Sequence, residues 1–135
     1  MTPFGRLRFL YVGSADTARD AAFYQRMGAR KAWHFRAFGA EVAAVDLGEG
    51  PLVLLADHRK PGTMLPIWEV ADLEATRAEL EKLGWVGQDP GFETPNGPCL
   101  LFTDPSGNEW AALEDRRPGA MEQAYADGRN PNAVR

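Results

Sequence analysis

The chain has 135 residues, of which 44% are hydrophobic and 25% are charged, and its formal net charge is −4. These values are typical of one compact soluble domain, and the lack of a Lys/Arg stripe argues against nucleic-acid binding. No apolar run approaches the roughly 18 residues that a membrane span requires. A single cysteine, Cys99, excludes an intrachain disulfide, and the N-terminus lacks a secretory apolar stretch, so we expect a cytoplasmic protein.

The first half of the chain predicts a strand, a helix and three further strands. Alternating apolar residues indicate the first strand over Arg6–Gly13. The segment Ser14–Thr17 supplies helix N-cap residues, and Gly28 suits the C-terminal cap, where φ is positive. The predicted ranges are Ala15–Met27 for the helix and Lys31–Ala37, Ala40–Leu47 and Leu52–Ala56 for the strands. The polar segment Asp57–Gly62 is expected to link the two halves.

The second half predicts the same order of elements. A strand over Leu65–Val70 precedes a helix that Asp72 caps and that continues to Leu83. The later strands are predicted over Trp85–Gln88, Cys99–Thr103 and Glu109–Leu113, with a tight turn at Asp104–Asn108. In the tail, residues 116–135, the segment Ala120–Ala126 is compatible with a short helix, and we expect the rest to be loosely held.

The two halves are copies of one pattern. Asp16 and Asp72 are 56 residues apart, and so are Gly28 and Gly84. A repeat of this period indicates two supersecondary units that share one core. We therefore expect one domain over residues 1–115, with module one at 6–57, a linker at 57–63 and module two at 64–115.

This repeated order resembles the vicinal oxygen chelate superfamily, which includes glyoxalases, bleomycin-resistance proteins and extradiol dioxygenases. The most specific motifs are DPSGNEW at residues 104–110 and AFYQRMG at residues 22–28. The resemblance covers about residues 6–115. It implies an α+β fold in which two tandem βαβββ modules form a pair of curled mixed-sheet half-barrels around a cleft, with the helices outside. It also implies a homodimer.

Metal-dependent members of this superfamily carry His on the first strand of each half and Glu on the last. The matching positions here are Phe9, Leu65, Ala111 and either Val53 or Leu54. None of these side chains has a lone pair with which to bind a divalent metal. The resemblance therefore implies a member without the usual metal site, and we expect no cofactor.

Strand alternation predicts which side chains would line the cleft. The set is apolar and aromatic with one or two carboxylates: Phe9, Tyr11, Trp33, His34, Val53, Leu55, Leu65, Ile67, Glu69, Glu109, Ala111 and Leu113. Two alternatives stay open at this point. The apolar residues could instead fill a collapsed half-barrel, and the two glutamates could be solvated at the cleft rim.

The remaining candidates have weaker signals. His34 is either structural or a ligand contact, whereas His58 in the linker is expected to be exposed. Cys99 is expected to be a core residue rather than a nucleophile. A shifted metal site drawn from His34, Glu41, Glu69 and Glu109 is the least favoured hypothesis.

The leading functional hypothesis is a metal-independent binding protein that sequesters an aromatic or partly cationic small molecule. An antibiotic or other secondary metabolite would suit it, with resistance or self-protection as the result. The alternative is a metal-free enzyme in which Glu69 or Glu109 acts as acid or base in isomerisation or epimerisation. Converging, desolvated carboxylates would favour the enzyme, and an open aromatic slot would favour binding. The sequence does not decide whether the protein is an enzyme, and no nucleic-acid or membrane partner is expected.

Overall fold

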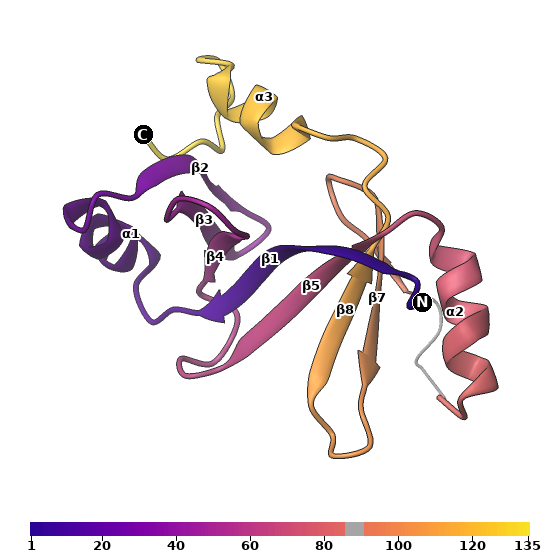
Figure 1. Ribbon diagram of the computed structural model, residues 1–135. Helices are drawn as coiled ribbons and strands as arrows, with labels where there is room; N and C mark the ends of the chain where they lie inside the picture. Colours follow the sequence, from indigo (N-terminus) through magenta and orange to yellow (C-terminus); the bar gives the residue numbers. More distant parts are fainter. Residues whose placement is uncertain (86–90) are drawn as a thin grey trace. The chain divides into compact units, whose positions relative to one another are not determined.

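The computed structural model describes residues 1–85 and 91–135, which form eight strands and three helices (Figure 1). The strands are β1 (Phe4–Gly13), β2 (Arg30–Ala37), β3 (Ala40–Asp46), β4 (Leu52–Ala56), β5 (Met64–Val70), β6 (Phe92–Glu93), β7 (Pro98–Thr103) and β8 (Glu109–Leu113). The helices are α1 (Thr17–Arg26), α2 (Leu73–Lys82) and α3 (Ala120–Ala126). The α+β class and the order βαβββ, repeated twice, are confirmed.

The chain divides into two compact units. The first-repeat unit comprises Phe9–Met64 and Met121–Arg135, and the second-repeat unit comprises Met1–Arg8 and Leu65–Ala120. Strand β1 therefore contributes residues to both units, and the C-terminal segment belongs with the first repeat.

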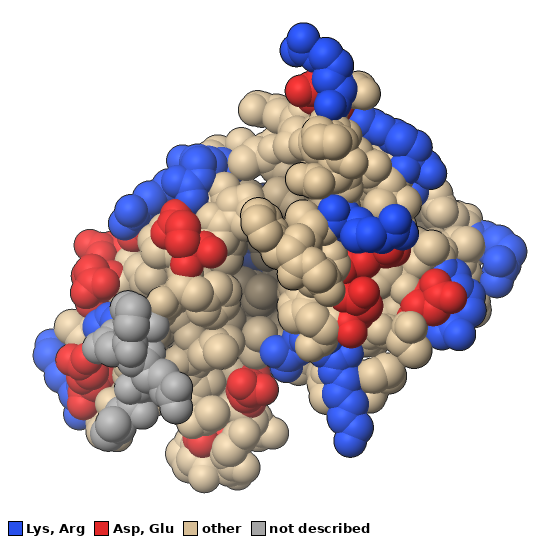
Figure 2. All heavy atoms as spheres, turned by 180° about the vertical axis from the view of Figure 1, so that it is seen from behind, with Lys and Arg blue, Asp and Glu red and all other residues tan. Residues whose placement is uncertain are grey.

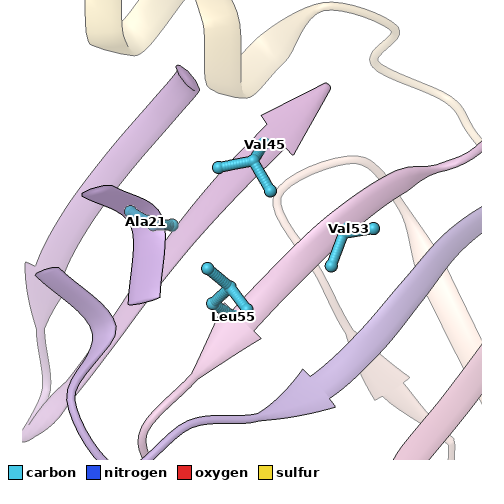
Figure 3. Close-up of a cluster of buried hydrophobic side chains, with 5 residues drawn as sticks. Ala21, Val45, Val53 and Leu55 are labelled. Carbon is cyan, nitrogen blue, oxygen red and sulfur yellow. The ribbon is translucent and has the colours of Figure 1, made fainter. Parts of the chain in front are cut away.

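The first-repeat unit has the strand order β2-β3-β4-β1, in which β1 and β4 are parallel and the other pairs antiparallel. Its core lies between this sheet and α1 and consists of Ala21, Ala43, Val45, Val53 and Leu55 (Figure 3). Among the N-cap candidates Ser14–Thr17, Asp16 caps α1 by accepting a hydrogen bond from the Arg19 amide, so the helix begins two residues later than predicted. Gly28 follows the helix with φ of 101°, which a residue with a side chain rarely adopts.

The second-repeat unit has the strand order β5-β8-β7-β6, with β5 and β8 parallel. Its core consists of Val70, Leu73, Leu100 and Ala112, so it lies on the face that α2 covers. Asp72 caps α2 by accepting from the Ala75 amide, which is the counterpart of the Asp16 cap.

Two segments of the second repeat differ from the sequence prediction. Trp85 belongs to no strand and packs against the α2 core instead, and the rest of the strand expected over Trp85–Gln88 lies outside the described residues. The short strand β6, at Phe92–Glu93, lies within a segment expected to be a loop. Its Phe92 pairs with Cys99 across a short antiparallel connection, and strand formation here depends on this pairing rather than on local propensity alone.

The C-terminal segment is held against strand β2, contrary to the expectation that it is loose. The Val134 amide donates to the His34 carbonyl at 2.8 Å, and the Arg36 amide donates to the Asn132 carbonyl at 2.9 Å. The Tyr125 hydroxyl in α3 donates to the Val134 carbonyl at 2.8 Å. Because β2 ends the strand order of its unit, this segment covers hydrogen-bonding groups that an edge strand would otherwise leave open.

Candidate functional site

Four positions match the metal ligands of the superfamily that the sequence resembles, and each carries a buried apolar side chain. Phe9 and Leu54 lie in the first-repeat unit, and Leu65 and Ala111 lie in the second. Each of the four is at most 6% exposed. Because these side chains offer no lone pairs, the four ligand positions do not fit a divalent metal.

The pairing of β1 with β4 decides between Val53 and Leu54 for the first-repeat position. Parallel register aligns Tyr11 with Leu54, whereas Val53 packs against Ala21 of α1. Leu54 therefore shares a face with Phe9 and Tyr11, and Val53 points to the opposite side. The prediction that Val53 and Leu55 line the ligand face is wrong, because both belong to the core beneath α1 (Figure 3).

Three of the predicted site residues share one face of the first-repeat sheet, which we call the apolar face: Phe9, Tyr11 and Trp33, together with Leu54. Trp33 joins them because it pairs with Ala44, which in turn pairs with Leu54. Phe9, Trp33 and Leu54 are buried, whereas Tyr11 is half-buried. The structure thus places these aromatic residues together, and their contact with a ligand stays a prediction.

His34 lies on the other side of this sheet and is only 1% exposed. It pairs with Ala43, a member of the core beneath α1. Its Nε2 lies 2.9 Å from Glu41 Oε2, and its Nδ1 lies 3.5 Å from Lys31 Nζ. The prediction that His34 contacts a ligand is therefore corrected, because adjacent strand residues face opposite ways and Trp33 occupies the apolar face.

The hydrogen-bond network assigns His34 as a neutral imidazole. The Lys31 ammonium can only donate, so Nδ1 accepts and the Nε2–H donates to Glu41. Burial lowers the pKa of His34, although the hydrogen bond to Glu41 acts in the opposite direction. Burial alone would raise the pKa of Glu41, but hydrogen bonds from His34 and Arg36 outweigh it and lower that pKa. The His34 imidazole and the Glu41 carboxylate are thus hydrogen-bonded to each other in the interior.

In the second-repeat unit, six predicted site residues share the face opposite α2: Leu65, Ile67, Glu69, Glu109, Ala111 and Leu113. Ile67 pairs with Ala111 and Glu69 with Leu113, whereas Ala112 packs into the α2 core. Alternation along β5 places Leu65 on the same face as Ile67.

Cys99 pairs with Leu113 and is buried, and burial raises the pKa of its thiol to about 12. The prediction that Cys99 is a core residue is confirmed, since a protonated buried thiol is a poor nucleophile.

The two glutamates on this face do not converge. Glu69 Oε2 accepts a hydrogen bond of 2.8 Å from Arg6 Nε, and Glu109 is exposed at the start of β8. The register aligns Glu109 with the level of Leu65, four residues from Glu69 along the strand direction. Four residues of extended strand span about 13 Å, so the carboxylates cannot act on one proton from adjacent positions.

The structure also brings together a pair that the sequence did not predict. The Tyr11 hydroxyl lies 2.9 Å from His58 Nε2, and the two rings are tilted with centroids 5.6 Å apart. His58 is exposed, as expected, but its contact with the apolar face was missed. The two residues are 47 positions apart, and no local pattern links them.

In residues 1–85 and 91–135, no group of three His, Cys, Asp or Glu side chains is arranged to hold a metal ion. Within those ranges, none of the helices is both long and apolar enough to cross a membrane. On the face shown in Figure 2, described Lys and Arg residues are interspersed with Asp and Glu and form no continuous stripe.

The repeated βαβββ order, with a parallel strand pair in each repeat, defines the fold of the vicinal oxygen chelate superfamily. No protein family model matches the chain, and no curated protein matches it in sequence. Among solved structures it is similar to methylmalonyl-CoA epimerase from Mycobacterium tuberculosis, with a TM-score of 0.74 and 16% identity over 87% of this chain and 92% of that chain.

Two further structures with this fold are methylmalonyl-CoA epimerases. A selenomethionine form has a TM-score of 0.72 and 13% identity, over 87% of this chain and 99% of that chain. A complex with methylmalonyl-CoA and NH4+ has a TM-score of 0.67 and 13% identity, over 84% of this chain and 96% of that chain. At such identities the similarity shows the fold alone.

Proposed function

We propose that the protein binds a small, largely hydrophobic molecule without a metal ion, as bleomycin-resistance proteins of this superfamily do. The observation that carries the proposal is the set of buried apolar side chains at the four ligand positions. An antibiotic or other secondary metabolite is the ligand class, and resistance or self-protection is the outcome. The protein acts as a homodimer in this proposal.

The aromatic residues of the apolar face supply the binding energy in this proposal. Phe9, Tyr11 and Trp33 share that face, and the Trp33 ring also lies 5.9 Å from the ring of Phe35. Aromatic side chains combine a large apolar area with preferred stacking geometries, so they suit a flat ligand. Binding of this kind is stoichiometric and involves no turnover.

A metal-free epimerase or isomerase is the second candidate. The three solved structures of this fold are named as methylmalonyl-CoA epimerases, and this favours an enzyme. Against it, Glu69 is paired with Arg6, and Glu109 is exposed and distant along the strands. Since neither carboxylate is desolvated beside the other, we place binding first.

The proposal is tested by metal analysis of the purified protein and by native mass spectrometry with a panel of aromatic antibiotics. We expect no stoichiometric divalent metal and a one-to-one complex that persists in the presence of a chelator. A stoichiometric metal, or binding that a chelator abolishes, contradicts the proposal.

The enzyme candidate needs a separate assay, because epimerisation leaves the mass of a compound unchanged. Methylmalonyl-CoA is incubated with the protein in D2O, and the α-proton is followed by mass spectrometry. Deuterium uptake above that of a protein-free sample favours the enzyme, and uptake equal to that sample favours binding.

The apolar face is tested by the substitution Phe9→Ala. Loss of the buried ring should weaken binding of the selected compound by about 1–3 kcal/mol. Because Phe9 is buried, Phe9→Leu is made in parallel to retain apolar volume, and the fold of both variants is checked by circular dichroism. The matched control is Phe23→Ala, which removes a 49% exposed ring from α1. Equal affinities for all variants would place Phe9 outside the site.

A further inference from the structure

The Tyr11–His58 pair lies at the polar end of the apolar face. Phe9, Trp33 and Leu54 on that face are buried, whereas Tyr11 is half-buried and His58 is exposed. The hydrogen bond between the Tyr11 hydroxyl and His58 Nε2 therefore marks the point at which this face meets solvent. A ligand lying on the aromatic rings would place its own polar group here.

His58 lies in a turn with a closely packed backbone. The segment 57–63, which follows β4, is closed by hydrogen bonds from the Thr63 amide to the Lys60 carbonyl at 3.2 Å and from the Gly13 amide to the Thr63 carbonyl at 3.1 Å. A Cβ on Gly13 would lie 2.0 Å from the Lys60 carbonyl oxygen, so only glycine allows this approach. The backbone of the turn that carries His58 is thus packed closely against β1 at Gly13.

The charges around this pair favour an anion. Arg59 and Lys60 follow His58 directly and Asp57 precedes it, so this turn carries two positive charges against one negative charge. Burial raises the pKa of Tyr11 to about 12, so the phenol stays protonated and able to donate. The Arg59 charge lowers that pKa and the Asp57 charge raises it, with the Arg59 effect the larger of the two.

We propose that Tyr11 and His58 form the polar end of the ligand site and hold the anionic head group of an aromatic organic acid, such as a sulfonate or carboxylate. This inference rests on the proposed function and names its ligand class. Their mutual hydrogen bond uses one of the two donors of the pair, so the head group accepts from the remaining one, either the Tyr11 O–H or the His58 ring N–H, in the field of Arg59 and Lys60. An anionic head group differs from the partly cationic ligand expected in the sequence analysis, because the charges beside the pair decide the preference.

The test compares two fluorescent probes that differ by one group. The compound 8-anilinonaphthalene-1-sulfonate carries the acid, and 1-anilinonaphthalene is its neutral counterpart. We expect the sulfonate to bind roughly tenfold more tightly, which corresponds to about one charge-assisted hydrogen bond. Tyr11→Phe and His58→Ala should each bring the ratio of the two affinities close to one.

Controls separate the possible causes. Lys82→Gln removes an exposed positive charge from α2 and should leave both affinities unchanged. Circular dichroism and thermal melting confirm that the two site variants are folded. Equal affinity of both probes, or no effect of either site variant, overturns the inference while the proposed binding function stands. Failure of both probes to bind contradicts the proposed function and the inference with it.

Discussion

The buried contact between His34 and Glu41 gives the sharpest stability prediction. The Glu41 carboxylate accepts a hydrogen bond from His34 Nε2 at 2.9 Å and from Arg36 Nε at 2.8 Å. In Glu41→Gln the side-chain amide must point an N–H group at one of these donors. A change of His34 tautomer does not remove a contact between two donors, because the His34 Nδ1–H would then face the Lys31 ammonium at 3.5 Å.

The size of the expected change in the free energy of unfolding depends on how deeply each hydrogen bond is buried. The Arg36 side chain is 67% exposed, so water screens its interaction and its loss contributes little. The His34 bond is buried, and a hydrogen bond to a charged group contributes roughly 1.5–3 kcal/mol. The amide oxygen can still accept from the buried His34 while the N–H group faces the exposed Arg36, so we expect Glu41→Gln to lower the free energy of unfolding by about 1 kcal/mol, the difference between a charged and a neutral acceptor.

The assay is urea unfolding followed by tryptophan fluorescence and circular dichroism. The control is Glu79→Gln, which breaks an exposed ion pair with Lys82 on α2 and should leave the free energy of unfolding unchanged within error. A loss below about 0.5 kcal/mol in Glu41→Gln would refute the reasoning, because it would mean that the buried carboxylate adds no net stability.

Two further predictions concern pH and the C-terminal segment. Burial lowers the pKa of His34 from its ordinary value of 6.5, so below that pH the unfolded chain binds a proton that the folded chain does not. The free energy of unfolding should therefore fall as the pH is lowered through about 6.5, and a slope that is equally steep in His34→Gln would contradict this. Deletion of residues 128–135 removes the hydrogen bonds that the segment makes with β2 and should cost about 1–3 kcal/mol. Hydrogen exchange should show faster exchange of the Arg36 amide in the deletion variant, and unchanged protection would mean that the segment does not cover the strand.

Features that depend on neighbouring residues could be predicted well from the sequence. The caps at Asp16 and Asp72 were expected because a short acceptor side chain before an amphipathic segment satisfies open helix amides. Strands β4 and β8 and helix α3 have the predicted bounds, since alternation and turn residues act over a few positions. The apolar ligand positions at Phe9, Leu65 and Ala111 also followed, because the repeat aligns the two halves.

Features that depend on register could not be predicted in this way. The length of the turn before β4 did not decide whether Val53 or Leu54 occupies the ligand position. Because a shift of one residue exchanges the two faces of a strand, Val53 and Leu55 were assigned to the wrong side. His34 and Trp33 were both placed at the ligand, although adjacent residues on β2 face opposite ways. Only the pairing of β1, β3 and β4 decided these orientations.

The sequence by itself determined the repeated βαβββ architecture, because it follows from residue types at set spacings, and its resemblance to the superfamily pointed to apolar side chains at the ligand positions. The tertiary structure decided which residues meet: Tyr11 with His58, and the C-terminal segment with β2. These contacts join residues 47 or more positions apart in the chain. They depend on how strands pair and loops close, and no local pattern of residues contains that information.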